Sequence, residues 1–279
     1  MQQAPAQRPI QQPTFPAPPP TAAPRKQVTF SDVTAGAGHR IVLYGPGGIG
    51  KTTLACQAPG PVAVIDLDDS LGRLKSQLET QGLLANVRVV AGVTDWLSLR
   101  DVINSGGWDD IGTIVVDSAT RGEESVAPEV LESIPNDKGH KVKRIEDYGF
   151  YKGYTHIFDT FLPLLSDLDA HCRAGRHVIL SCHECTANVP NPNGEDWIRY
   201  EPRLQTSNTG KASIRLRVKE WADHVLFMGY DVAVGKDGKG TGCGSRTIYP
   251  AETPACMAKS RTCGEQIPMP ADVWAQIIK

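Results

Sequence analysis

A glycine-rich segment of the sequence has the residue types and spacing that bind a phosphate group. Residues 45–52 read Gly-Pro-Gly-Gly-Ile-Gly-Lys-Thr and fit the Walker A pattern G-x-x-x-x-G-K-[ST] at every position. The glycines let backbone N–H groups turn inward around a phosphate, and the start of the following helix adds a favourable dipole. In this pattern the lysine supplies charge to the β- and γ-phosphates, and the threonine hydroxyl can ligate Mg²⁺. We therefore predict a nucleotide-binding loop formed by Gly45, Pro46, Gly47, Gly48, Ile49, Gly50, Lys51, Thr52 and Thr53.

Acidic side chains close two apolar runs of the sequence. Residues 113–117 end in Asp117, which we expect beside the phosphate-binding loop, where it would hold Mg²⁺ through water. Residues 62–66 end in Asp66, and Asp68 and Asp69 follow directly. One of these three acids could orient or deprotonate an attacking water. The alternative is that they cap the helix that comes next.

Such residues must be positioned by buried strands and the helices between them. The nearly continuous apolar runs that predict strands are residues 40–44, 62–66, 87–91, 113–117 and 178–182. Runs without alternation are typical of strands buried on both faces of a parallel sheet. Helices are predicted at residues 51–57, at 95–104 with Thr94 as N-cap, and at 155–172, where Pro163 should cause a kink or a restart. This alternation predicts an α/β fold with a mostly parallel central sheet.

The sequence changes character after Cys182. His183 follows a predicted strand, and at that place it could report the state of a γ-phosphate. Residues 184–210 are rich in Pro, Asn and Gly, which predicts a long loop. The alternation of apolar and basic residues at 214–219 predicts a half-buried strand with one basic face. Residues 225–249 predict a hairpin, and a C-terminal helix is expected to begin at Pro270.

Composition limits the class of protein. The 279 residues carry 29 Lys and Arg against 31 Asp and Glu, a net charge of −2, which excludes a globally basic nucleic-acid coat. No apolar run approaches the roughly 18 residues of a membrane span. Eight of the first 25 residues are Pro and none is acidic, which predicts a disordered tail. We expect a cytoplasmic protein with a tail at 1–27, a core at 28–232, and a hairpin and short helix packed on it at 233–279.

Several of these segments resemble a known family. Val115-Val116-Asp117-Ser118-Ala119 is similar to the Walker B strand of the RecA recombinases, and Ile65-Asp66-Leu67-Asp68 resembles the RecA segment that ends in the catalytic glutamate. The resemblance implies that Asp68 positions water, although Asp stands where that family has Glu. His183 falls where RecA proteins place a γ-phosphate-sensing Gln, and residues 184–210 fall where they place their second DNA-binding loop. Lys259 and Arg261 resemble the element with which a RecA subunit reaches its neighbour's ATP.

The chain looks most like the phage-encoded RecA-like ATPases of the single-strand-annealing group, over roughly residues 38–265. AAA+ proteins fit less well, because Ser118 stands where they usually have an acid after the Walker B Asp. The resemblance implies ATP and Mg²⁺ as cofactors, a homo-oligomeric ring or filament, single-stranded DNA as partner, and the host cytoplasm as location. A single-strand-binding protein is a further candidate partner.

Aromatic side chains interleaved with cations suit stacking on unpaired bases. The residues predicted to contact DNA on this ground are Trp197, Arg199, Tyr200, Arg203 and Lys211. The function expected from the whole sequence is ATP hydrolysis coupled to single-stranded DNA binding in phage recombination, annealing or repair. The alternatives are a replication ATPase of the helicase-loader type, a small-molecule phosphotransferase, and a nucleotide-gated DNA-binding module that does not hydrolyse ATP.

Overall fold

The computed structural model describes residues 28–30, 38–207, 211–234 and 240–278. The chain divides into two compact units, residues 1–35 and 36–279. In the first unit, Val28, Thr29 and Phe30 are described, and all three are exposed. The disordered tail predicted for residues 1–27 lies outside the described residues, and the domain boundaries drawn from the sequence stay a prediction.

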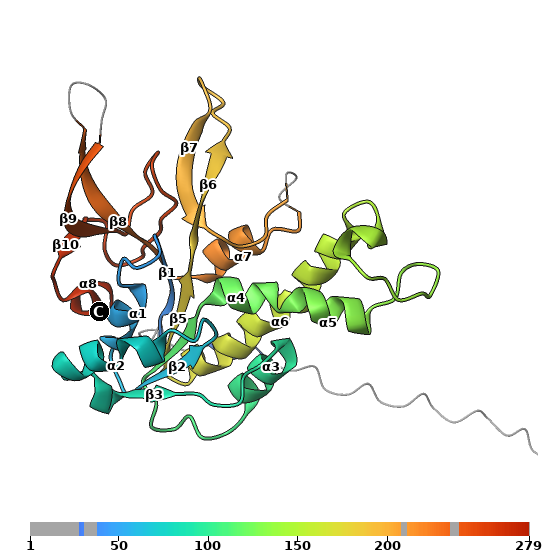
Figure 1. Cartoon of the computed structure of the whole chain (residues 1–279), viewed down its shortest axis with the longest axis horizontal. Coiled ribbons are helices and arrows are strands. Elements are labelled where there is room, and N and C mark those ends of the chain that lie inside the picture. The colour runs from blue at the N-terminus through green and yellow to red at the C-terminus, as the bar shows by residue number, and fades with distance from the viewer. Residues whose placement is uncertain (1–27, 31–37, 208–210, 235–239, 279) are drawn as a thin grey trace, which may run out of the picture. The chain divides into compact units, whose positions relative to one another are not determined.

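An eight-stranded sheet forms the centre of the second unit, in the order β10-β9-β8-β1-β5-β4-β2-β3 (Figure 1). The strands are β1 (Arg40–Tyr44), β2 (Val62–Asp66), β3 (Val87–Val89), β4 (Thr113–Asp117), β5 (His177–Cys182), β8 (His224–Val234), β9 (Gly240–Tyr249) and β10 (Ile267–Met269). The six strands from β8 to β3 are parallel, and β9 and β10 join antiparallel. The α/β fold predicted from the sequence is confirmed. Strand β5 lies between β1 and β4, so the end of β5 lies between the phosphate-binding loop and Asp117.

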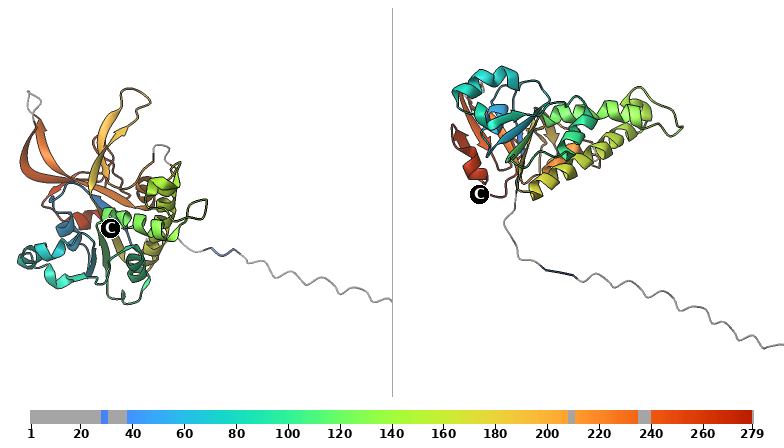
Figure 2. Two further views of the ribbon diagram at one scale, coloured as in Figure 1. Left: turned by 45° about the vertical axis from the view of Figure 1, so that its right-hand side comes forward. Right: turned by 90° about the horizontal axis from the view of Figure 1, so that it is seen from below.

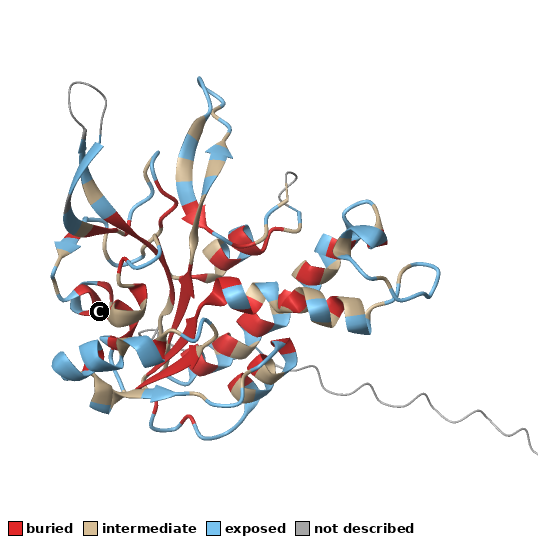
Figure 3. Cartoon of the chain, in the orientation of Figure 1, coloured by how far each residue is buried: buried red, intermediate tan, exposed pale blue. Residues whose placement is uncertain are grey.

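Helices cover both faces of this sheet (Figures 2 and 3). They are α1 (Lys51–Cys56), α2 (Leu71–Thr80), α3 (Trp96–Asn104), α4 (Ala119–Glu124), α5 (Val126–Ser133), α6 (Lys152–Arg173), α7 (Ile214–Trp221) and α8 (Val273–Ile277), with 3-10 turns at Leu84–Asn86 and Ile145–Tyr148. Successive residues of a strand point to opposite faces. Thus Ile41 and Leu43 of β1 pack with α1, α2 and α8, while Val42 and Tyr44 pack with α3 to α7. Among the described residues, no helix is long and apolar enough to cross a membrane.

Two predicted helices differ in detail from the structure. The N-cap of α3 is Asp95, whose carboxylate accepts the N–H of Ser98 at 2.8 Å, so the prediction of Thr94 was wrong. Helix α6 runs through Pro163 without a restart over 22 residues. Its apolar face, which includes Ile157, Phe161 and Leu168, is buried in the core, and packing of that face outweighs the loss of the backbone hydrogen bond that proline removes.

The segment between residues 184 and 221 was predicted wrongly. Strands β6 (Glu184–Val189) and β7 (Trp197–Pro202) form an antiparallel hairpin where a long loop was expected. The expected strand from residue 214 is helix α7, which begins after Ser213 and buries Ile214 and Val218, four residues apart. The hairpin predicted at 225–249 is confirmed as β8 and β9, and its turn at 235–239 lies outside the described residues. Both hairpins project from the same side of the sheet (Figures 1 and 2).

The C-terminal helix also begins later than expected. Helix α8 begins at Val273 rather than at Pro270; Asp272 is its N-cap, and the Asp272 carboxylate accepts the N–H of Ala275 at 3.1 Å. A side-chain acceptor at the N-cap satisfies one of the free amides of a helix start.

Candidate nucleotide-binding site

The glycine-rich loop connects the end of β1 to the start of α1. Gly50 is the N-cap of α1 and has a left-handed backbone with φ of 106°, which a residue with a side chain rarely adopts. A Cβ atom on Gly45 would lie 2.1 Å from the carbonyl oxygen of Met228 on β8. Glycine is therefore required at these two positions, one for conformation and one for the close approach of a neighbouring strand.

The side chain of Lys51 lies inside the loop. Its Nζ donates to the carbonyl oxygens of Gly45 at 2.8 Å and Pro46 at 2.9 Å, and the residue is 9% exposed. Burial lowers the pKa of Lys51, whereas the carboxylates of Asp117 and Glu184 favour its charged form. An ammonium group in this position can exchange a carbonyl partner for a phosphate oxygen.

Thr52 and Asp117 are brought together as the sequence predicts. The Thr52 hydroxyl donates to Oδ2 of Asp117 at 2.5 Å, although 65 residues separate them in the chain. Asp117 is 4% exposed, and burial raises its pKa while the hydroxyl groups of Thr52 and Ser181 lower it. A hydroxyl and a carboxylate are the hard oxygen donors that Mg²⁺ prefers, so these residues fit that ion.

The three acids after β2 have different surroundings. Asp66 accepts the N–H groups of Ser70 at 3.0 Å and Leu71 at 2.8 Å and so caps α2, which confirms the capping alternative for this residue. Asp69 is exposed. Asp68 instead reaches across the edge of the sheet, where its Oδ2 lies 3.1 Å from Nε2 of His183. Two residues selected separately for chemistry are thus in direct contact.

Two residues of the site were missed. Arg246 of β9 donates from Nη1 to the carbonyl oxygen of Ile49 at 2.6 Å, and it lines a cavity of about 730 Å³ beside the loop, together with Arg73 and Gln77 of α2. No sequence pattern marks Arg246, because 197 residues separate it from Ile49. Glu184 follows His183. Burial raises its pKa, while Lys51 and His183 favour its charged form.

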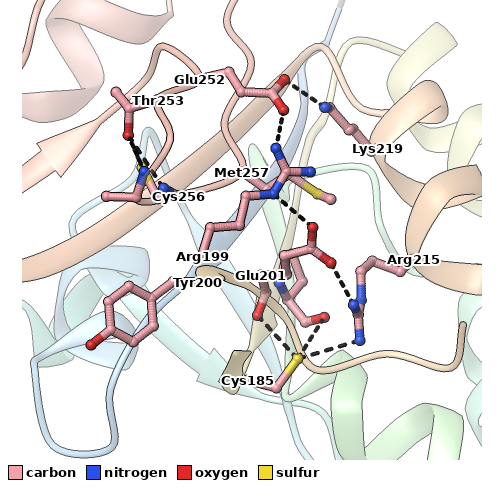
Figure 4. A network of polar contacts seen from close by, with 12 residues as sticks. Cys185, Arg199, Tyr200, Glu201, Arg215, Lys219, Glu252, Thr253, Cys256 and Met257 are labelled. Atoms are coloured by element: carbon pink, nitrogen blue, oxygen red, sulfur yellow. Dashed lines mark hydrogen bonds and ion pairs between the residues drawn. The ribbon is translucent and has the colours of Figure 1, made fainter. Parts of the chain in front are cut away.

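The predicted DNA contacts are divided by the structure. Arg199 is 12% exposed and lies in a network of ion pairs at the base of the β6–β7 hairpin (Figure 4). Its guanidinium contacts Glu201 at 2.8 Å and Glu252 at 2.5 Å, and Glu201 also contacts Arg215 of α7 at 2.5 Å. The side chain of Arg199 is therefore engaged at the base of the hairpin, and its contact with DNA stays a prediction to which this geometry adds no support.

Three of the other four residues of that set are exposed to solvent. The side chain of Tyr200 is 41% exposed and stacks on Phe227 with ring centroids 5.1 Å apart. Arg203 is 54% exposed and lies 3.5 Å from Glu124, and Lys211 is exposed. Trp197 is partly buried. Tyr200, Arg203 and Lys211 are thus exposed to solvent.

The cations predicted to reach a neighbouring subunit are engaged within their own chain. Nζ of Lys259 donates to the carbonyl oxygens that end α7, at 3.1 Å to Lys219, 3.2 Å to Glu220 and 2.5 Å to Ala222. Arg261 lies 3.0 Å from Asp223. Lys259 forms an isolated bridge with Val225 rather than a strand. The role of both residues in trans stays a prediction, and this geometry adds no support to it.

The sheet order and the phosphate-binding loop define the class: this is an α/β protein with a mostly parallel sheet and a P-loop of the NTPase type. Within that class the chain belongs to the AAA_24 family, described as an AAA domain, which matches residues 37–262. On the sequence alone, AAA+ proteins fit less well, because Ser118 follows Asp117. The match to an AAA domain corrects that ranking.

Solved structures similar to this chain are distant in sequence. The RadB recombinase is 18% identical, with a TM-score of 0.41, and the match covers 77% of this chain and 80% of that one. A KaiC-like protein from Pyrococcus horikoshii OT3 is 15% identical, with a TM-score of 0.40 and coverage of 83% and 85%. The flagellar accessory protein FlaH from Methanocaldococcus jannaschii is 11% identical, with a TM-score of 0.38 and coverage of 76% and 77%. No curated protein sequence matches the chain.

Proposed function

We propose that this protein is a Mg²⁺-dependent ATPase whose hydrolysis is coupled to single-stranded DNA, in phage recombination, annealing or repair. The observation that carries the proposal is the contact between Asp68 and His183. Asp68 lies at the same edge of the sheet as the phosphate-binding loop, and His183 directly precedes the β6–β7 hairpin. The contact therefore connects the phosphate-binding edge to the hairpin. A group at that position can respond both to a bound phosphate and to a ligand on the hairpin.

In this proposal the loop binds the phosphates of ATP, and Lys51 neutralises the β- and γ-phosphate oxygens. Thr52 and Asp117 would hold Mg²⁺, which would supply positive charge to neutralise the phosphates when bound. The cavity beside the loop, lined by Arg73, Gln77 and Arg246, accommodates the nucleoside. Its volume of about 730 Å³ lies within the usual range for small-ligand sites of about 300–1,000 Å³.

Asp68 orients the attacking water and accepts its proton. His183, 3.1 Å away, holds the Asp68 carboxylate in place. Both side chains are partly exposed, so water reaches them without rearrangement of the core. The side chain of Asp68 is one methylene shorter than that of a glutamate, so its carboxylate reaches less far toward the attacking water. We therefore expect hydrolysis to be slow.

The DNA-binding surface is the outer side of the β6–β7 hairpin and its base. Ile198 and Tyr200 are 70% and 41% exposed there, and Arg203 and Lys211 supply positive charge. The backbone of Tyr200 is tied to the end of β1, since its carbonyl accepts the Tyr44 hydroxyl at 3.0 Å. Aromatic stacking contributes about 1–3 kcal/mol per base and tolerates any sequence.

The experiment is to measure ATP turnover and DNA affinity together. We expect single-stranded DNA to increase turnover and the DNA affinity to fall with salt, as phosphate contacts require. Tyr200→Ala should weaken DNA binding by about 1–3 kcal/mol, whereas Tyr230→Ala, an equally exposed tyrosine on β8, serves as the control. Protein that hydrolyses ATP without binding DNA would contradict the coupling. Protein that binds both without turnover would favour the non-hydrolysing module.

The proposal also includes assembly and location. We expect a homo-oligomeric ring or filament in the host cytoplasm, with a single-strand-binding protein as candidate partner. Sedimentation with and without ATP and DNA measures the assembly directly.

A further inference from the structure

Thr120 lies between the nucleotide-binding edge and the β6–β7 hairpin. It occupies the first turn of α4, three residues after Asp117, and is 2% exposed. Neither the phosphate-binding loop nor the ion-pair network includes it. Its hydroxyl nevertheless contacts both ends of the hairpin.

The contacts of Thr120 close the base of the hairpin. Its Oγ1 accepts the backbone N–H of His183 at 3.1 Å and donates to the carbonyl oxygen of Arg203 at 3.0 Å. The N–H of Arg203 in turn donates to the carbonyl oxygen of His183 at 2.8 Å. His183 precedes β6 and Arg203 follows β7, so one buried hydroxyl bridges the entry and the exit of the hairpin.

Helix α4 contacts the same exit through two more residues. The carboxylate of Glu123 accepts the N–H of Gln205 at 3.1 Å, and Glu124 lies 3.5 Å from the guanidinium of Arg203. The start of α4 is itself fixed, because the Ser118 side chain accepts the N–H of Arg121 at 3.2 Å. The helix that begins beside Asp117 is thus connected to residues 203–205.

We propose that Thr120 is a positioning residue that couples the nucleotide state to the β6–β7 hairpin. The inference rests on the proposed function, since the hairpin is the proposed DNA-binding surface. His183 contacts Asp68 through its ring and Thr120 through its amide, so a shift of His183 that follows the γ-phosphate is passed to Arg203. Coupling of binding free energies is reciprocal, so DNA bound at the hairpin raises nucleotide affinity by the same factor.

The test uses three variants of the full chain. Thr120→Val removes the hydroxyl while keeping the shape, and Thr120→Ser keeps the hydroxyl. Ser125→Ala removes a hydroxyl of the same helical segment, which donates to the carbonyl oxygen of Gly122. The measurements are turnover without DNA, the ratio of turnover with and without DNA, and DNA affinity with and without a non-hydrolysable ATP analogue. Melting temperature records folding.

We expect Thr120→Val to keep DNA-free turnover within about threefold of wild type. It should also lose most of the DNA stimulation and the nucleotide dependence of DNA affinity. Thr120→Ser and Ser125→Ala should keep both. A Thr120→Val protein that melts normally and retains full stimulation would overturn the proposal. Wild-type protein that binds no DNA would instead contradict the proposed function.

Hydrogen exchange in the wild-type protein tests the same proposal without a substitution. The backbone amide of His183 donates to Thr120, so its exchange should slow when the ATP analogue binds and slow further when DNA is added. If neither ligand changes the exchange rate of the His183 amide, the proposal is overturned, even if Thr120→Val fails to fold.

Discussion

The nucleotide-binding edge and the segment 184–221 show two ways in which a sequence determines structure. At the edge, Lys51, Thr52 and Asp117 come from short motifs at or just after the ends of strands buried on both faces, and the structure brings Thr52 and Asp117 together. In the segment 184–221, a predicted loop is a hairpin and a predicted strand is a helix. The first region depends on local pattern, and the second depends on contacts between distant residues.

The ion pairs explain why the second region was not recognised. Glu201 is nearly buried and contacts Arg199 and Arg215, so three charged residues form the inner face of the hairpin base (Figure 4). Apolar alternation is the usual signal of a strand, and here charged side chains occupy inward positions. In α7 the buried Arg215 stands between apolar residues, which gives the alternation of a strand.

The largest expected effect is at the edge. Lys51→Ala should reduce ATP turnover by about 10²–10³-fold or more, because a preorganised positive charge on the transferring phosphate is lost. The fold should remain intact, since the hydrogen bonds of the Lys51 ammonium are to the carbonyl oxygens of Gly45 and Pro46 in its own loop. Turnover and melting temperature are measured against Lys75→Ala, an exposed lysine on α2. Unchanged ATP turnover in Lys51→Ala would contradict the assignment of this loop as the nucleotide-binding site.

A second substitution tests the acids. Asp68→Asn should lower turnover by about 10²-fold, the lower end of general acid–base effects, with ATP affinity nearly unchanged. Asp117→Asn should also weaken the dependence on Mg²⁺, because Asp117 lies against Thr52. ATP turnover measured over a series of Mg²⁺ concentrations separates the effects of the two substitutions. Asp69→Asn, at an exposed position, is the control. Wild-type turnover in Asp68→Asn would show that another group activates water.

A third substitution tests the hairpin base. Glu201→Ala should lower the free energy of unfolding by about 3–5 kcal/mol, because it leaves two arginines without their shared partner. Chemical denaturation measures this effect. Glu195→Ala, in the exposed turn of the same hairpin, should change stability by less than about 0.5 kcal/mol. Equal effects of the two would show that the network does not hold the hairpin.

The smallest effect concerns a histidine cluster at the amino ends of β1, β5 and β8. His224 is fully buried and contacts His39 and Ser260 at 2.9 Å each, and burial lowers its pKa to about 4. The unfolded chain takes up this proton below about pH 6.5, so stability is present above that pH and is lost as pH falls toward 4.

This loss should be on the order of 3 kcal/mol at most, since one pKa unit corresponds to about 1.4 kcal/mol. Unfolding free energies measured from pH 7 to 4 should decline less in His224→Gln than in wild type. Replacement of the exposed His140 by Asn should leave the decline unaltered. Identical slopes for wild type and His224→Gln would exclude this histidine as the cause.

The sequence therefore predicts the parts of the site that short patterns specify. Five of the six parallel strands, β1 to β5, follow from buried apolar runs, and the loop, Asp68 and His183 follow from the residues that end those runs. Arg246 and Thr120 could not be predicted, because each acts through a backbone atom far away in the chain, and backbone partners leave no signal in residue types. The hydrogen bonds of Lys259 could not be predicted for the same reason, because its ammonium donates to three backbone carbonyl oxygens.

Helix α8 forms part of the support beneath the phosphate-binding loop. The indole N–H of Trp274 donates to the carbonyl oxygen of Leu54 at 2.9 Å, and Val273 and Ile277 are buried with α1 in one core. A truncation that removes α8 would expose that carbonyl and open a space behind α1. Nucleotide affinity then depends partly on α8, which lies about 220 positions after the loop in the sequence. Protein preparations with and without α8 are therefore not interchangeable in binding assays.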